Sequence, residues 1–175
     1  NVWFDPGAHK FYHPDAYAFC TPYHKEITFA DVPSYSEVLE FPIEKMFRTN
    51  EEQLIAQREL GIDINKIHVI NVGLWTSGKN QKEGVEIAKL VEGIHPELQF
   101  HFIGNQAPNF QDYWEPIMKD LPSNVKVWGE KDNVSDFMCA ADVLMFNSTW
   151  ECNPLVLREG ISYGLKILAR NLPQY

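Results

Sequence analysis

The stretch "VINVGLWTSGKNQKEGVEIAKL", Val69 to Leu90, runs from an apolar segment through a glycine-bounded turn into an amphipathic helix. Further along the chain, similar apolar runs alternate with helical patterns, as expected for right-handed βαβ units. The sequence therefore predicts an α/β fold with a doubly wound, parallel, Rossmann-like sheet. We expect strands at 67–73, 98–104, 124–129, 142–148 and 166–170, and helices at 81–94, about 110–120, 134–141 and 155–163.

Composition limits the class of protein. The chain has 175 residues, 45% of them hydrophobic, which is enough for one sizeable core. Its net charge of −9, without a basic stripe, excludes nucleic acid as an expected partner. No apolar run approaches the roughly 20 residues of a transmembrane helix. Three widely spaced cysteines suit reduced thiols, so we expect a cytoplasmic protein, with peripheral membrane association as an alternative.

The N-terminal part is less regular than the rest. Short strands are expected at "YAFC" and "SEVLEFPI", and residues 1–45 are interpreted as the edge of a preceding domain or a linker. Asn50 with Gln53 predicts a capping box that opens a helix ending at Gly61. Residues 46–175 would then form the Rossmann-like domain, truncated at its C-terminal end because the chain stops just after a strand-like run.

Gly73, Gly78 and Lys79 have the G-x-x-x-x-G-K spacing of a phosphate-binding P-loop. That mechanism requires a hydroxyl after the lysine to bind Mg²⁺, and Asn80 has none. A Walker-B aspartate should end an apolar strand, whereas Asp142 begins one. The stretch is better interpreted as a glycine turn whose lysine and helix-start amides favour an anion. The alternative for Lys79 is a solvated surface lysine.

A second candidate site is "NSTWECNPLVLREGISYG", residues 147–164. Asn153 followed by Pro154 predicts a helix start, with a side-chain cap and then a residue that has no donor to satisfy. The free N–H groups of Leu155 and Val156 would then form a diphosphate site at the end of a strand.

Two carboxylates, Glu151 and Glu159, bracket this turn and would suit sugar or ribose hydroxyls as acceptors. The alternative is that Glu159 pairs with Arg158 or Lys166, or is solvated.

Two further groups are weaker. His9, His13, Cys20 and His24 could in principle hold zinc, but CxxC pairs are missing and scattered histidines are favoured. Tryptophans fall at strand-end loops at positions 75, 128 and 150, where packing is favoured over base stacking.

These residues carry a resemblance to retaining GT-B glycosyltransferases of family 4, in their C-terminal donor-binding domain. That family reads roughly "S-x-x-E-G-F-G-x-x-x-x-E-A-x-A-x-G", and this chain has Ser148, Glu151, Glu159 and Gly164 at the matching places, with Cys152-Asn153-Pro154 replacing the glycine-rich part. The opening turn is similar to "V-G-R-L-x-x-x-K-G/N", with Gly73 and Lys79 matched, and "FHFIGN", which holds Gly104, resembles a third landmark. The match spans about residues 67–170.

The resemblance implies a role for each matched residue. Glu159 would bind the ribose, Glu151 would lie near the donor sugar, Lys79 would pair with the diphosphate, and the backbone around Trp128 would meet the base. Leu74 replaces the family's arginine, and Lys82 is the expected substitute as the second cation. The expected catalytic residues are Glu151 and Lys79; the expected donor-binding residues are Gly73, Lys79, Lys82, Gly104, Trp128, Ser148, Asn153, Pro154, Leu155 and Glu159.

The function implied is the donor half of a retaining, hexosyltransferase-like enzyme whose substrate is a nucleotide-diphospho-sugar. No metal and no cofactor are expected, because lysine and amides hold the phosphates. The acceptor would be a glycan, a lipid-linked molecule or a protein, and residues 1–45 would be the edge of an otherwise missing acceptor-side N-terminal domain, so that the piece alone is inactive. Alternatives are a non-catalytic nucleotide-sugar-binding or scaffolding module, a nucleotide-sugar epimerase and a phosphorylase-like protein.

Overall fold

The computed structural model of the chain describes residues 15–28 and 35–173. Its described residues form two compact units. One holds residues 15–28, 35–42, 151–155 and 171–173, and the other holds 43–150 and 156–170. Within the described residues, no helix combines the length and the apolar character needed to cross a membrane.

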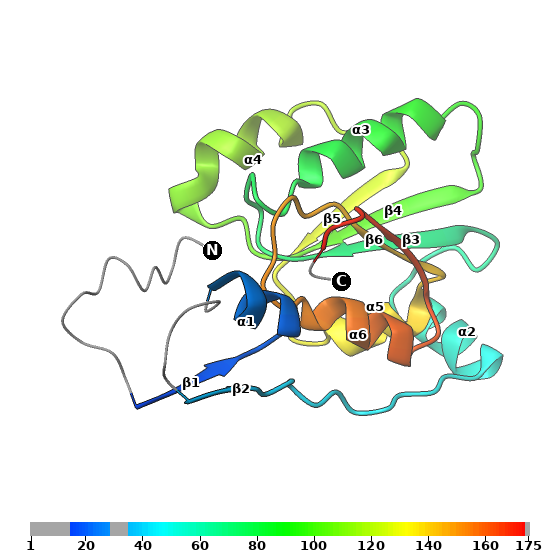
Figure 1. Cartoon of the computed structure of the whole chain (residues 1–175). Coiled ribbons are helices and arrows are strands. Elements are labelled where there is room, and N and C mark those ends of the chain that lie inside the picture. The colour runs from blue at the N-terminus through cyan, green and yellow to red at the C-terminus, as the bar shows by residue number, and fades with distance from the viewer. Residues whose placement is uncertain (1–14, 29–34, 174–175) are drawn as a thin grey trace. The chain divides into compact units, whose positions relative to one another are not determined.

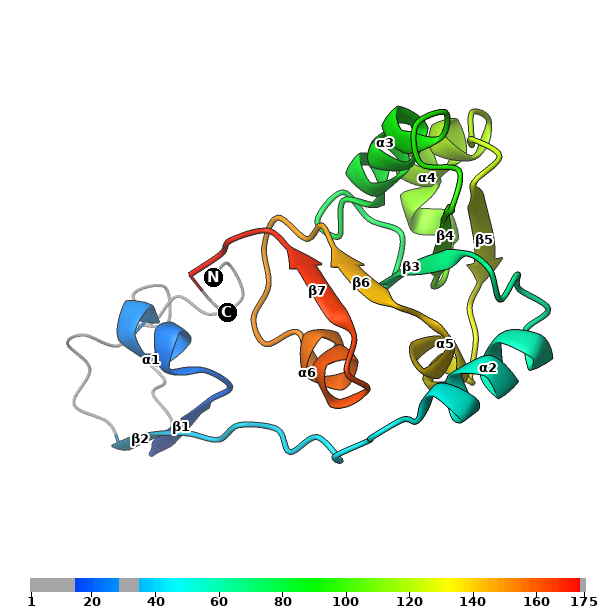
Figure 2. The same ribbon diagram turned by 90° about the vertical axis from the view of Figure 1, so that its right-hand side faces the viewer.

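The larger unit is built on a five-stranded parallel sheet (Figures 1 and 2). Its strands stand in the order β5-β4-β3-β6-β7, so β3 is central and the chain first builds one side of the sheet and then the other. The α/β, doubly wound, parallel fold predicted from the sequence is confirmed. The strands are β3 (Ile67–Val72), β4 (Leu98–Ile103), β5 (Val125–Gly129), β6 (Val143–Phe146) and β7 (Lys166–Ala169).

Helices cover both faces of this sheet (Figure 1). On one face, α3 (Gln81–Val91) and α4 (Gln111–Met118), which follows a 3-10 turn at Pro108–Phe110, enclose a core around Val85, Phe102 and Met145. On the other face, α5 (Val134–Ala140) and α6 (Leu155–Ser162) enclose a core around Phe137 and Leu144. The four expected helices are therefore present, and each face of the sheet is buried as a parallel sheet requires.

Glycines let two of these helices approach the sheet closely. A Cβ at Gly84 of α3 would lie 2.7 Å from Met145 Cε, and a Cβ at Gly160 of α6 would lie 2.7 Å from Leu144 Cδ2. Gly84 thus allows the first turn of α3 to lie close to β6 on one face of the sheet, and Gly160 allows α6 to lie close to the same strand on the other face.

The N-cap residue of helix α2 (Asn50–Glu59) lies one residue before the one that the sequence suggested. The N-cap is Thr49, whose hydroxyl accepts the Glu52 N–H while the Glu52 carboxylate accepts the Thr49 N–H. The prediction of an Asn50–Gln53 box is therefore wrong, because both pairs have the right spacing and only Thr49 has the extended backbone of a cap (φ −90°, ψ 164°). The expected stop at Gly61 is confirmed by its left-handed φ of +63°.

The smaller unit contains a βαβ element in which β1 (Ala16–Phe19) and β2 (Tyr35–Val38) pair in parallel around α1 (Pro22–Thr28). Lys25 Nζ donates to the Ser36 carbonyl at 2.8 Å. In the same unit, the Asn153 side-chain amide donates to the Cys20 carbonyl at 3.2 Å. The two units divide between residues 42 and 43, and the expected domain boundary at 45/46 stays a prediction.

Candidate functional site

The order in which the chain adds strands to the sheet reverses between β3 and β6, and the carboxyl ends of these two strands mark that point. After β3 the chain turns into α3 on one face, and after β6 it turns into α6 on the other. In open α/β sheets, ligands bind outside the strands at such a switch point. The loops to examine are therefore the β3–α3 turn, residues 73–80, and the β6–α6 loop, residues 147–154.

Gly73 and Gly104 end the neighbouring strands β3 and β4. The Gly73 N–H donates to the Ile103 carbonyl at 2.9 Å, and the Gly104 N–H donates to the Gly129 carbonyl at 2.8 Å. Gly104 has a φ of +151°, and a Cβ there would lie only 1.9 Å from the Gly73 carbonyl oxygen. The backbones at the ends of β3 and β4 are thus in direct contact, and only glycine fits at position 104.

Lys79 folds back over the first of these glycines. A Cβ built on Gly73 would lie 3.6 to 3.8 Å from Lys79 Cδ, Cγ and Cε, and Lys79 Nζ lies 5.6 Å from the centroid of the Phe146 ring. Phe146 is the last residue of β6. The half-buried lysine therefore crosses the edge of the sheet from β3 to β6, in contrast to a solvated surface lysine.

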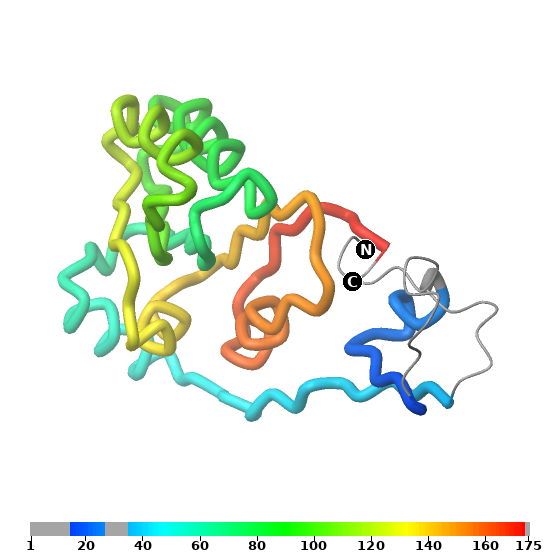
Figure 3. Tube along the Cα trace, turned by 90° about the vertical axis from the view of Figure 1, so that its left-hand side faces the viewer, coloured from blue at the N-terminus to red at the C-terminus, as the bar shows by residue number. Residues whose placement is uncertain are grey.

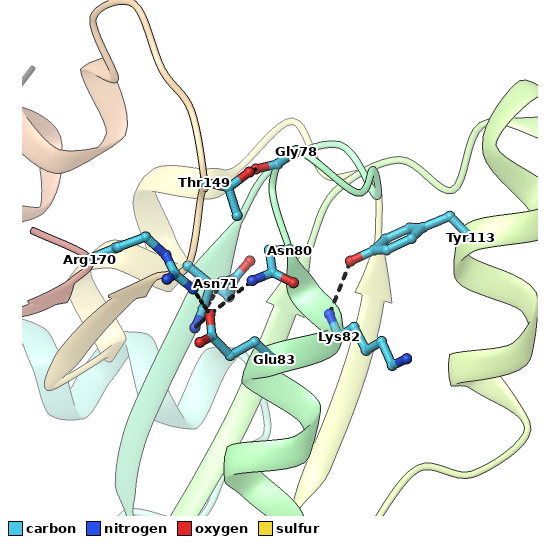
Figure 4. Close-up of polar contacts among 9 residues, drawn as sticks. Asn71, Gly78, Asn80, Lys82, Glu83, Tyr113, Thr149 and Arg170 are labelled. Carbon is cyan, nitrogen blue, oxygen red and sulfur yellow. Dashed lines mark hydrogen bonds and ion pairs between the residues drawn. The ribbon is translucent and has the colours of Figure 1, made fainter. Parts of the chain in front are cut away.

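A direct contact joins the two loops. The Thr149 N–H and hydroxyl both donate to the Gly78 carbonyl, at 2.9 and 3.3 Å. Figure 3 shows the loops side by side, and Figure 4 shows the Thr149–Gly78 contact above the start of α3. Ser148, the residue before Thr149 and expected in the donor site, is fully buried at 1% exposure. The two stretches singled out from the sequence therefore meet at the switch point.

The structure also places a polar network here that sequence reasoning missed (Figure 4). The Glu83 carboxylate accepts hydrogen bonds from Asn80 Nδ2 at 2.9 Å, Asn147 Nδ2 at 3.3 Å and Arg170 Nη2 at 2.6 Å. Asn71 Nδ2 in turn donates to Asn147 Oδ1 at 3.2 Å. An asparagine inside the apolar run "IHVINVG" was a signal for part of this network, but no local pattern connects Arg170 with Glu83.

The geometry of Asn80 differs from what a triphosphatase P-loop requires at this position. Its backbone is left-handed, with φ +54°, and its amide is tied to Glu83. The side chain after the lysine is thus an amide held by a carboxylate, with no hydroxyl to offer Mg²⁺. Within the loop, Lys79 and Asn80 donate their N–H groups to the Thr76 carbonyl, at 3.1 and 3.0 Å.

Lys82 is not brought to Lys79. Its backbone N–H donates to the Tyr113 hydroxyl at 3.1 Å, and it lines a groove between α3 and α4 together with Glu86 and Asp112. Figure 4 shows its side chain directed away from Glu83. The structure thus separates this expected second cation from the switch point.

Two of the three tryptophan side chains that fall at strand-end loops, Trp75 and Trp128, pack as the sequence analysis favoured, whereas Trp150 is 40% exposed. Trp75 is fully buried, with its ring 5.4 Å from that of Phe102. The Trp128 ring lies edge-on against Phe137 at 4.9 Å, and its Nε1–H donates to His101 Nδ1 at 3.0 Å. The partly buried Trp128 side chain therefore packs against the core, while contact of its backbone with a base stays a prediction.

Below the site, a chain of hydrogen bonds links three strands. Because Trp128 donates to His101 Nδ1, neutral His101 carries its proton on Nε2 and donates to His68 Nδ1 at 2.9 Å; His68 Nε2 then donates to the Asp63 carbonyl at 3.0 Å. Burial lowers the pKa of His68, and burial followed by the charges of His68 and Lys126 lowers the pKa of His101 to about 3. Both histidines are therefore neutral structural groups at physiological pH.

The remaining expected residues lie at and before α6. Helix α6 begins at Leu155, as expected, and Pro154 directly precedes it. Glu159 is half-buried on α6, and within the described residues its carboxylate makes neither a hydrogen bond nor an ion pair, so the expected alternative of a partner in Arg158 or Lys166 is not observed. Glu151, a buried carboxylate, is grouped with Asn153 in the smaller unit. Its meeting with Lys79 and Glu159 around a donor stays a prediction.

The expected zinc alternative falls partly outside the described residues, because His9 and His13 lie there. Cys20 Sγ is 4.0 Å from His24 Nδ1, and the Thr21 hydroxyl is 2.6 Å from the same nitrogen. Across residues 15–28 and 35–173, no group of three histidine, cysteine or acidic side chains is arranged to hold a metal ion.

A doubly wound α/β domain with a lysine and two joined loops at its switch point belongs to the class of open α/β sheets whose ligands bind at that point. Residues 52–175 match the family of glycosyl transferases group 1, and the chain belongs to this family.

The proteins that this chain resembles are longer than the chain itself. It is 28% identical over 132 residues to an uncharacterized 41.2 kDa protein in the cps region of Klebsiella pneumoniae, a match covering 74% of this chain and 32% of that protein. The fold is similar to WaaG, a glycosyltransferase involved in lipopolysaccharide biosynthesis (TM-score 0.72, 22% identity, 87% of this chain and 43% of that one). It is also similar to Anabaena Alr3699/HepE in complex with UDP and glucose (TM-score 0.75, 16% identity, 91% and 45%). The chain thus spans a third to a half of these proteins.

Proposed function

We propose that this chain is the donor-binding part of a retaining glycosyltransferase and binds a nucleotide-diphospho-sugar at the switch point between β3 and β6. One observation carries the proposal: Lys79 lies across Gly73 and reaches the end of β6, where Thr149 ties the second loop to the first. A diphosphate is the ligand that suits a lysine at a glycine turn. Family membership supports the reaction class.

The chemistry is stabilisation of a leaving group. As the bond from the anomeric carbon to the phosphate oxygen breaks, negative charge grows on the diphosphate, and a fixed cation with backbone amides stabilises it. Lys79 supplies the cation and the residues after Asn153 supply the amides. Since these groups hold the charge, the proposal needs neither metal nor cofactor.

Carboxylates would hold the hydroxyls of the donor. Glu159 is available for the ribose, because its carboxylate makes neither a hydrogen bond nor an ion pair within residues 15–28 and 35–173. Glu151 would lie near the donor sugar. Complexes of HepE with UDP and glucose and with UDP-glucose support such a donor by analogy of fold.

The acceptor would be bound by another part of the protein. We propose a glycan, lipid-linked or protein acceptor, and a cytoplasmic setting in which the enzyme can associate with a membrane surface. Transfer requires an acceptor held against the donor and water excluded from both. The 175-residue chain by itself should therefore bind a donor with an affinity of about −4 to −6 kcal/mol, in the high-micromolar to millimolar range, and transfer nothing.

A screen of UDP-, GDP-, ADP- and dTDP-sugars by thermal shift tests the proposal. A donor at about ten times its Kd should stabilise the fold by about 1.4 kcal/mol, because binding contributes RT ln(1 + [L]/Kd). Glu159→Gln should weaken that binding by roughly 1.5–3 kcal/mol, the contribution of a charged hydrogen bond. If none of the four classes of donor stabilised the fold, the proposal would be rejected.

A second candidate is a non-catalytic nucleotide-sugar-binding module. It is favoured by Leu74, an exposed apolar side chain at the position where the resemblance expects an arginine. Donor binding by the full-length protein without any glycoside product or donor hydrolysis would support this candidate over the transferase.

A further inference from the structure

Arg170 lies directly after β7, at the same edge of the sheet as Lys79. Its Nη2 donates to Glu83 Oε2 at 2.6 Å, and its backbone N–H donates to the Phe146 carbonyl at 3.4 Å. The Arg170 and Glu83 side chains are 40% and 41% exposed. The guanidinium is therefore fixed at one point and still open to solvent.

Phe146 is the common neighbour of two cations. Lys79 Nζ lies 5.6 Å from the centre of its ring, and Arg170 bonds to its carbonyl through the backbone. In the sheet, β6 stands between β3 and β7. Lys79 comes from the β3 side and Arg170 from the β7 side, so the two positive side chains flank the end of β6.

Glu83 holds the guanidinium in this place. The carboxylate is itself fixed by two amides, from Asn80 and Asn147, and the second of these is buried (Figure 4). A guanidinium carries five N–H donors, and the pair with Glu83 uses one nitrogen. The planar group can thus keep its contact with Glu83 and present further N–H donors to phosphate oxygens, to which guanidinium binds in a bidentate manner.

The sequence had suggested Lys82 as the second cation beside Lys79. Lys82 instead lines the α3–α4 groove with acidic neighbours, including Glu86 and Asp112. Arg170 shares the edge with Lys79, although it lies far from Lys79 along the chain and belongs to no motif.

We propose that Arg170 is the second phosphate-binding cation of the donor site and that Glu83 is its positioning residue. The inference rests on the proposed function, since it assigns further residues to the same site. Lys79 lies on one side of β6 and Arg170 on the other, so the diphosphate is bound between these two cations. The nucleoside makes its contacts elsewhere.

The test compares the binding of UDP and GDP with the binding of uridine and guanosine by calorimetry. Arg170→Ala should weaken diphosphate binding about 10- to 100-fold, as expected for charge-assisted hydrogen bonds, and leave nucleoside binding unchanged. Arg170→Lys should fall between, because it keeps the charge and loses the planar fork. The matched control is Lys166→Ala, which removes an exposed cation from the other end of β7 and should change binding by less than about twofold.

A double variant separates positioning from packing. Because Glu83 acts through Arg170, Glu83→Gln alone should weaken diphosphate binding and should cause no further loss when it is added to Arg170→Ala. A Glu83→Gln variant that binds the diphosphate as tightly as the unmodified chain would overturn the role of Glu83.

The outcomes also distinguish the two proposals. If the unmodified chain binds UDP or GDP and Lys79→Ala weakens that binding, but Arg170→Ala behaves like Lys166→Ala, the assignment of Arg170 is wrong and the donor site stands. Equal weakening of nucleoside and diphosphate binding by Arg170→Ala would show a structural role and would also overturn the assignment. If the unmodified chain binds neither diphosphate, the proposed function and the role of Arg170 fail together.

Discussion

At the scale of single residues, the contact between Lys79 and Gly73 is the observation on which the proposed donor site depends. The lysine stem lies on the bare face of Gly73, within 3.6 to 3.8 Å of where a Cβ would stand. A Cβ at position 73 would make ordinary van der Waals contact with the stem, so the constraint on this position is its backbone φ of +155°, which favours glycine.

Gly104 should be the least replaceable glycine of this edge. In Gly104→Ala the Cβ would meet the Gly73 carbonyl oxygen at 1.9 Å in a backbone conformation with φ +151°, so the strand ends must separate. We expect a loss of roughly 1–3 kcal/mol in the free energy of unfolding, measured with urea. The control Gly93→Ala adds its Cβ where nothing lies within 4 Å, and should be neutral or stabilising by up to about 1 kcal/mol. Equal stability of the two variants would show that the close approach at position 104 is not a constraint.

Among the elements, helix α2 depends on the N-cap Thr49, whereas the sequence had suggested the next residue, Asn50, as the cap. Thr49→Ala removes the hydroxyl that accepts the Glu52 N–H, and should cost about 1 kcal/mol of stability. Asn50→Ala changes the first residue inside the helix and should have little effect. Urea unfolding of the two variants makes the comparison; a larger loss for Asn50→Ala would restore the cap predicted from the sequence.

Strands β3, β4 and β5 are joined by the Trp128–His101–His68 chain, which should make the domain sensitive to acid. The folded-state pKa of His101 is about 3, below the ordinary 6.5, so the unfolded chain binds more protons below pH 6.5. Stability is then fully present above about pH 6.5 and falls as pH is lowered toward 3, by up to about 1.4 kcal/mol per pH unit for each such histidine.

Urea unfolding between pH 7.5 and 5 measures this dependence before the carboxylates titrate. His101→Gln should be less stable at neutral pH and should show a shallower loss on acidification. A stability that stays constant or rises from pH 7.5 to 5 would contradict the neutral, buried state of the two histidines.

The elements were largely predictable because their signals are local. Alternating apolar runs and helical periods located the strands and helices from Ile67 onward, and Gly61 marked the end of α2. The network around Glu83 was not predictable in this way, since its hydrogen bonds join Asn80, Asn147 and Arg170 across the order of strands in the sheet. Lys82 shows the converse: it is close to Lys79 in sequence, but Lys79 lies in the turn before α3, whereas Lys82 lies on α3 and lines the α3–α4 groove.

At the scale of the whole molecule, the proposed function makes this chain one wall of a site. It covers 32% of its Klebsiella relative and 43% to 45% of the WaaG and HepE chains, and its switch point lies on a single sheet. Donor binding and glycosyl transfer are therefore separable properties in the proposal. The first can be measured on this chain, and the second requires the parts that position an acceptor.

The most direct test of the account is the effect of Lys79→Ala on nucleotide binding, with Lys166→Ala as the control for loss of a lysine. Calorimetry should show UDP or GDP binding weakened about 10- to 100-fold in Lys79→Ala and unchanged in the control, while uridine or guanosine binds both variants equally. Mg²⁺-dependent ATP or GTP hydrolysis by the unmodified chain that is lost in Lys79→Ala would contradict the account and restore a triphosphatase loop, as would diphosphate binding that Lys79→Ala leaves unchanged.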